Sequence, residues 1–143
     1  MIGLDTNILV HAFRPDSPQH ERAARAVNDR VAGGRRIAVP WPVVHEFLAV
    51  VTNRRVFVGS SPMGEALAAV AALTELDTVE LLAESSQHVV TMTRLLETPG
   101  VTGPKVHDAR IAAICIDHGV DELWTADRDF SYFPELTTRN PLV

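Results

Sequence analysis

The chain has 143 residues, 46% of them hydrophobic and 22% charged, with a formal net charge of −5. These values are typical of a globular protein with one domain, expected over residues 1–143, and no apolar run reaches the length of a membrane span. The start, MIGLDTN, does not resemble a signal peptide, and the single cysteine, Cys115, excludes an internal disulfide, so we expect a cytoplasmic protein.

Apolar runs and turn-forming residues predict strands that alternate with helices. In chain order, the first half is expected to hold a strand (1–5), two helices (6–14 and 16–34), a strand (36–40) and two helices (42–55 and 60–76). Ser17 is the expected N-cap of the second helix, with Pro18 in its first turn. The stripe of Met63, Leu67 and Val70 fits either packing on the core or contact with a partner.

The second half continues the same alternation. It is expected to hold a strand (78–83), a helix (85–97), a loop (98–104), a helix (105–119), a strand (121–126) and a short fifth strand within 137–143. Nearly uninterrupted apolar strands between helices indicate a parallel sheet of four or five strands that is covered on both faces. The expected fold class is α/β.

Acidic residues occur where the strands of this sheet are expected to end. Function in open parallel sheets collects at the carboxyl ends of the strands, beside the starts of the following helices. One acid ends the first strand, one lies a turn into the helix after the second strand, one begins the helix before the fourth strand, and two follow that strand. In that order they are Asp5, Glu46, Asp108, Asp127 and Asp129.

Each acid alone has an ordinary structural explanation. Asp5 and Asp108 suit helix N-termini, Asp127 and Asp129 suit a turn, and Glu46 suits a salt bridge with an arginine. Neither capping nor turn formation requires all five at one edge, however. Carboxylates so close together repel one another, so such a cluster persists only with protonation or with divalent cations. Oxygen ligands without a Cys/His set favour Mg²⁺ or Mn²⁺.

The helix that carries Glu46 is mostly apolar, with a narrow and less apolar seam of His45, Glu46, Ala49 and Asn53. An acid in apolar surroundings is unfavourable unless a charged partner meets it. We therefore expect Glu46 to need a partner in the folded protein.

At these positions the chain resembles PIN domains, and among them the VapC-type toxins of bacterial toxin–antitoxin (VapBC) pairs. The resemblance rests on ordered segments that span most of the chain: LDTNILV (4–10), PVVHEFLAVVTNRRVF (42–57), VHDARIAAICIDHGV (106–120), LWTADRDFSYF (123–133) and the final NPLV. Residues 58–104 match only in their layout of helices and strands. The resemblance implies a three-layer α/β/α fold and an Mg²⁺- or Mn²⁺-dependent endoribonuclease. It also implies a homodimer, silenced by a cognate antitoxin whose tail lies across the active site.

The resemblance also assigns roles to residues by position. Metal binding and catalysis fall to the acidic quartet and an accessory acid: Asp5, Glu46, Asp108, Asp127 and, as the accessory, Asp129. Thr6, Asn7 and Thr125 match polar positions that orient the carboxylates or a metal-bound water. No acid of the set is missing, so an active enzyme is expected. Bound cations suit phosphodiester hydrolysis, because they supply a hydroxide nucleophile and neutralise charge on the phosphate.

RNA contacts are less clearly marked. The negative net charge does not exclude RNA, because cations bound by the acids would offset it locally. Basic residues near the acidic edge either meet phosphates or form surface salt bridges: Arg14, Lys105, Arg110 and Arg128. Trp41 and Phe130 are candidates for stacking on bases, whereas Phe47, Trp124 and Phe133 are expected in the core. The six histidines lack a catalytic spacing, although His107 lies beside Asp108 and is a candidate substrate contact.

Rival functions fit the sequence less well. A phosphatase of the haloacid dehalogenase type needs a second carboxylate two residues after Asp5, where this chain has Asn7. A phospho-receiver domain needs a phosphate acceptor after the third strand, where Ala83 and Glu84 stand. A non-catalytic module that binds RNA or protein remains open, as does the choice among transfer, ribosomal and messenger RNA.

Overall fold

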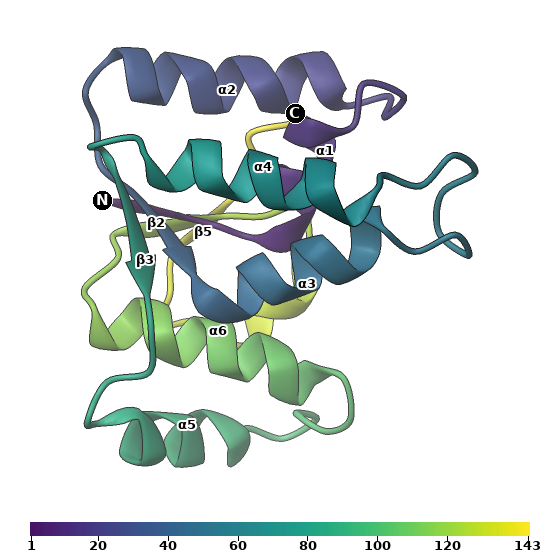
Figure 1. Cartoon of the computed structure of the whole chain (residues 1–143). Coiled ribbons are helices and arrows are strands. Elements are labelled where there is room, and N and C mark those ends of the chain that lie inside the picture. The colour runs from purple at the N-terminus through teal and green to yellow at the C-terminus, as the bar shows by residue number, and fades with distance from the viewer.

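The computed structural model describes all 143 residues and has a central sheet of five parallel strands (Figure 1). The strands are β1 (Ile2–Leu4), β2 (Ile37–Pro40), β3 (Val79–Leu82), β4 (Glu122–Trp124) and β5 (Thr138–Arg139). Their order across the sheet is β3-β2-β1-β4-β5, and every neighbouring pair is parallel. The chain therefore builds outward from β1 on one side and then crosses to β4 on the other. This reversal makes the carboxyl ends of β1 and β4 the expected place for a site.

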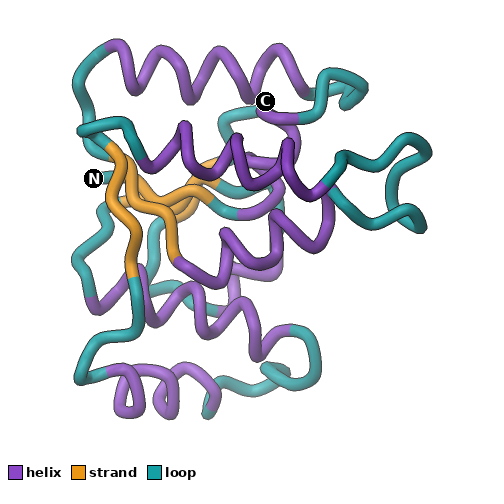
Figure 2. Tube along the Cα trace, viewed as in Figure 1, coloured by secondary structure: helices purple, strands orange, loops and turns teal.

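Helices cover both faces of the sheet and confirm the three-layer α/β/α arrangement (Figures 1 and 2). One face carries α1 (Thr6–Phe13), α2 (His20–Ala32) and α4 (Met63–Thr74), and the other carries α5 (His88–Leu96) and α6 (Lys105–Asp117). Between them, α3 (Trp41–Val51) leaves the carboxyl end of β2 and contacts α1, α4 and α6. None of the helices combines the length and the apolar character that a membrane crossing needs.

The core is one cluster of 31 buried hydrophobic residues. Every residue of β1 and β2 is buried, as expected for strands covered on both faces. Gly3 permits side chains of both β4 and α6 to approach β1 closely, because a Cβ added there would lie 3.1 Å from Leu123 Cδ1 and 3.4 Å from Cys115 Sγ. Burial raises the pKa of the Cys115 thiol to about 12, so this cysteine is a small apolar core residue.

Two helix boundaries show the largest differences from the sequence prediction. The second helix begins at His20, because Ser17 stabilises a turn before it: its Oγ accepts a hydrogen bond from the Gln19 backbone N–H at 3.2 Å and contacts His11 Nδ1 at 2.6 Å. The helix expected to reach residue 55 ends at Val51. There the Asn53 side chain accepts a hydrogen bond from the Arg55 N–H at 2.9 Å, which favours a turn over a further helical turn.

Candidate active site

The five acids come from four elements that meet at the carboxyl edge of the sheet. Asp5 caps α1 directly after β1, and Asp127 caps a short 3₁₀ helix, η1 (Arg128–Tyr132), that follows β4. A cleft of about 720 Å³ is lined by Glu46, Asp108, Asp127 and Asp129, and an adjoining hollow of about 290 Å³ is lined by Asp5, Glu46, Asp108 and Asp127. The two spaces share three acids, so they form one continuous acidic site.

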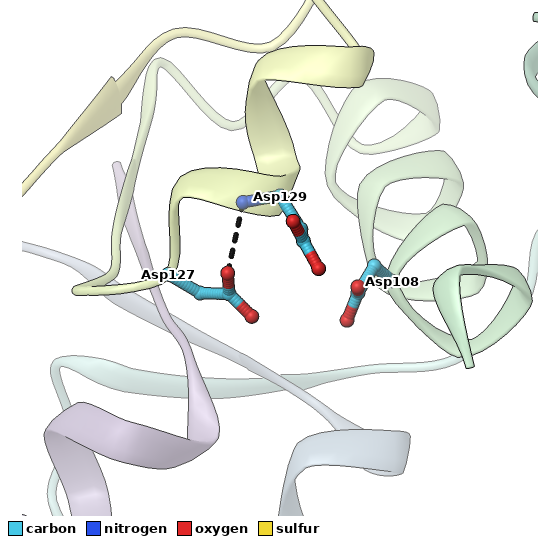
Figure 3. Close-up of side chains that lie close together, drawn as sticks. All are labelled: Asp108, Asp127 and Asp129. Carbon is cyan, nitrogen blue, oxygen red and sulfur yellow. Dashed lines mark hydrogen bonds between the residues drawn. The ribbon is translucent and has the colours of Figure 1, made fainter. Parts of the chain in front are cut away.

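Three of the acids form a tight group. One carboxylate oxygen from each of Asp108, Asp127 and Asp129 lies within 4.8 Å of the other two, and Figure 3 shows the three side chains turned toward a common space. Asp127 Oδ1 also accepts a hydrogen bond from the Asp129 backbone N–H at 2.8 Å, which fixes the spacing of this pair. Asp5 and Glu46 lie outside the tight group but line the same site.

Asp5 is held in place by polar neighbours at the base of the site. Its side chain is buried and accepts hydrogen bonds from the Thr6 N–H at 2.8 Å, from Thr125 Oγ1 at 2.6 Å and from Asn7 Nδ2 at 2.7 Å. Burial raises the pKa of this carboxyl, and the nearby charge of Glu46 adds to the effect, while the hydrogen bonds act in the opposite direction. The carboxylate is thus fixed in orientation but costly to ionise without a cation.

Thr125 also connects the two ends of the site. Besides donating to Asp5, its hydroxyl oxygen accepts a hydrogen bond from the Asp127 N–H at 2.9 Å. Asn7 Oδ1 accepts from the Ala126 N–H at 3.0 Å and so holds the same loop. The polar residues matched to orienting positions therefore contact the acids directly.

Asp108 shows the strongest electrostatic consequence of the cluster. Its pKa is raised to about 7, first by partial burial and then by repulsion from Asp127, Asp5, Asp129 and Glu46, in that order. A cation among these carboxylates would relieve the repulsion and favour the ionised form. The donor set contains only oxygen atoms, so it suits a hard divalent cation.

Glu46 has surroundings that differ from the expectation. The seam of His45, Glu46, Ala49 and Asn53 is exposed, so Glu46 faces solvent in the site instead of an apolar interior. The expectation of apolar surroundings for Glu46 is therefore wrong, and exposure lowers the cost of its charge. The partner is neutral: Thr6 Oγ1 donates a hydrogen bond to Glu46 Oε2 at 3.0 Å.

Two candidates for RNA contact are also corrected. Arg14 is buried instead of free to meet a phosphate: it pairs with Asp16, with Nη2 and Oδ2 2.6 Å apart, and its Nη1 donates to the Gly59 carbonyl at 3.0 Å. Phe130 is not available for stacking, because η1 turns its ring into the core against Phe133. Phe47, Trp124 and Phe133 are buried as predicted. Trp41 is exposed and lines the acidic cleft together with His107.

An apolar hollow of about 160 Å³ lies among α1, α2, α3 and α4, and the sequence did not predict it. Only hydrophobic residues line it: Leu9, Ala12, Phe13, Val27, Val44, Phe47, Ala69, Val70 and Leu73. Of the stripe predicted on α4, only Val70 reaches this hollow, while Met63 and Leu67 are exposed. The lining comes from four helices that are separated in the sequence, so no local pattern marks this hollow.

Comparison with known proteins agrees with this geometry. The family model of the PIN domain matches residues 2–136. The chain belongs to the PIN-domain family. This PIN domain is 34% identical to ribonuclease VapC31 and 32% identical to ribonuclease VapC33, both of Mycobacterium tuberculosis, over 142 residues that cover 99% of each chain.

Solved structures resemble this PIN domain in fold. The VapBC2 structure from Rickettsia felis, bound to a promoter DNA fragment, superposes with a TM-score of 0.71 at 22% identity and covers 98% of both chains. VapC20 of Mycobacterium tuberculosis, described as a toxin that cleaves the sarcin–ricin loop, superposes with a TM-score of 0.67 at 19% identity, covering 92% of this chain and 93% of that one.

Proposed function

We propose that this PIN domain is a metal-dependent endoribonuclease, and that it is the toxin of a cytoplasmic toxin–antitoxin pair. One observation carries the proposal: carboxylates from separate elements, Asp108 on one and Asp127 and Asp129 on another, converge within 4.8 Å in an open cleft. The relatives named as ribonucleases over nearly the whole chain support the same reading. Residues 1–143 act as one catalytic unit in this proposal.

The cation in this proposal is Mg²⁺ or Mn²⁺, held by Asp108, Asp127 and Asp129, with Asp5 and Glu46 beside them. A bound ion of this type activates water and neutralises charge on the phosphate oxygens. The donor chemistry fits, because all five side chains offer carboxylate oxygens, and burial together with the neighbouring acids already disfavours the ionised form of Asp108.

Neighbouring residues of the chain orient the carboxylates of the site. Asp5 is fixed by the Thr6 N–H, Thr125 and Asn7, so its carboxylate needs little reorganisation when charge develops nearby. Thr6 binds one oxygen of Glu46 and leaves the other free to accept a proton or to contact a cation. The open cleft admits a phosphodiester from solvent to these groups.

The test is an RNA cleavage assay with Mg²⁺, with EDTA, and with the variants Asp5→Asn and Asp108→Asn. We expect the wild type to cleave only with the metal and both variants to be at least about 100-fold slower, since charge stabilisation of this kind is a large catalytic term. Asp117→Asn is the matched control, because Asp117 lies on α6 away from the site. Equal rates for wild type and Asp108→Asn would refute the mechanism. No cleavage of any RNA would favour the non-catalytic module.

The antitoxin is proposed to cover both hollows. Leu9 on α1 and Phe47 on α3 line the apolar hollow, whereas Val10 and Glu46 on the same two helices line the acidic one. A peptide anchored by apolar side chains in the first hollow would therefore extend across the acids and block RNA. The proposed homodimer is tested separately, by measuring the mass of the purified chain in solution.

A further inference from the structure

The acidic cleft is also lined by an aromatic side chain that the proposed metal chemistry does not use. Trp41 directly follows β2, and it lines the same cleft as Asp108, Asp127 and Asp129. Its residue is 41% exposed, whereas Trp124 is 7% exposed and donates its indole N–H to Glu122 Oε1 at 2.8 Å. The two tryptophans thus differ: Trp124 belongs to the core, and Trp41 presents a large apolar ring to solvent beside the acids.

The position of Trp41 is restricted by its neighbours. Pro40 and Pro42 flank it, and both limit the backbone at the point where β2 passes into α3. One helical turn later, the His45 ring meets the indole edge-on, with ring centroids 6.2 Å apart and planes at 63°. An aromatic ring held in this way loses little conformational entropy when a ligand stacks on it.

The lining of the cleft combines two kinds of side chain. Some are charged, namely Glu46, Asp108, Arg110, Asp127 and Asp129, and the others offer rings or apolar surface, namely Trp41, Pro42, His45, Pro104, His107 and Ile111. At about 720 Å³ the cleft falls in the size range of sites that enclose small organic ligands. A nucleotide has the matching division, with a phosphate that belongs near a cation and a base that belongs on an aromatic surface.

We propose that Trp41 stacks on an unpaired RNA base that neighbours the phosphate to be cut. This proposal rests on the proposed ribonuclease function. A base in a duplex offers its edges but not its faces, because both faces are covered by neighbouring base pairs. A base that is free to leave the strand can instead stack on an indole.

Kinetics of RNA cleavage test the proposal directly. Stacking contributes to binding of the substrate and of the transition state alike, so Trp41→Ala is expected to raise KM roughly 5- to 150-fold with kcat little changed. Trp41→Phe retains an aromatic face and is expected to recover most of the loss. Val89→Ala removes an exposed apolar side chain on α5, outside the cleft, and serves as the control. An unchanged KM in Trp41→Ala overturns the proposal.

Tryptophan fluorescence separates this proposal from the ribonuclease proposal, because it does not need cleavage. In the Asp108→Asn background with Mg²⁺, an unstructured 12-nucleotide oligouridylate or oligoadenylate is expected to quench the emission, and a duplex of the same length is not. The quenching should disappear when Trp41→Phe is added, since only buried Trp124 then emits. Emission that RNA leaves unchanged overturns stacking even if the wild type cleaves RNA. Emission that changes only with protein concentration places Trp41 between two copies of the chain and also overturns it.

Discussion

Replacing Asp108 with asparagine is expected to stabilise the metal-free protein at pH 8. In the folded chain the pKa of this carboxyl is raised from 3.8 to about 7, chiefly by burial and then by the neighbouring acids. The folded state therefore holds the proton more tightly than the unfolded state. This contribution favours folding most below about pH 4 and is lost as the pH rises through 7, where the buried group must ionise. Asparagine does not ionise, so the variant avoids this cost at pH 8.

The size of the effect follows from the shift. A pKa change of about three units corresponds to at most about 4 kcal/mol of unfolding free energy. Asp108 is only half-buried, and solvent screening reduces this to about 1–2 kcal/mol. For a chain of 143 residues, that gain raises the melting temperature by about 3–6 °C.

Thermal melts in EDTA at pH 8 and pH 4, on wild type and Asp108→Asn, measure this effect. The melting temperature of Asp108→Asn should exceed that of the wild type at pH 8 and should nearly equal it at pH 4. Mg²⁺ should raise the melting temperature of the wild type more than that of the variant. Asp117→Asn is the control, since the Asp117 carboxylate accepts hydrogen bonds from Ser85 and Thr91 and its neutralisation should bring no gain. A variant that is no more stable than wild type at pH 8, or equally stabilised at both pH values, would refute the reasoning.

Three further substitutions test the hydrogen bond to Glu46, the buried Arg14 and the apolar hollow. Thr6→Val removes the hydrogen bond to Glu46, and we expect kcat for RNA to fall about 10-fold with an unchanged melting temperature; an unchanged kcat would contradict the orienting role. Arg14→Met leaves the Gly59 carbonyl and the Ser61 hydroxyl without their donor, so urea unfolding should show that the free energy of unfolding falls by about 2–4 kcal/mol. A fall below about 1 kcal/mol would contradict the structural role of Arg14. Ala69→Glu places a charge in the apolar hollow, so calorimetry should show weaker binding of the purified antitoxin, while RNA cleavage is unchanged. An unchanged affinity for the antitoxin would place the antitoxin elsewhere on the surface.

The parts of the fold that the sequence predicted are those set by local pattern. The apolar runs around β1 and β2 have only one way to be buried, between two layers of helices, and that burial is observed. Asp5 and Asp127 follow their strands within a few residues, so strand order alone brings them to one edge. Family resemblance added the three-layer arrangement, which the structure also shows.

The mistaken expectations concern residues whose surroundings are distant in sequence. Arg14 is buried because the loop around Gly59 and Ser61 folds over it, 45 and 47 residues away. Phe130 lies in a segment with mixed polar and aromatic residues, and its ring is buried where η1 packs against α6. The apolar neighbours of Glu46 in sequence predict apolar surroundings, yet the exposed side of α3 is set by where α1 and α6 pack.

The register between β1 and β4 determines the arrangement of the site, because it sets which residues just past the two strands become neighbours. Leu4 pairs with Trp124 in parallel register, and the Asp5 N–H donates to the Trp124 carbonyl at 3.0 Å. Asp5 and Thr125 therefore come next to each other, although 120 residues separate them, and the hydroxyl of Thr125 reaches the Asp5 carboxylate at 2.6 Å. A slip of one residue would put Trp124 or Ala126 at that place and would turn the side chains of β4 to the opposite face. The hydrogen-bonded register of β1 and β4 is thus the feature that assembles the acidic site.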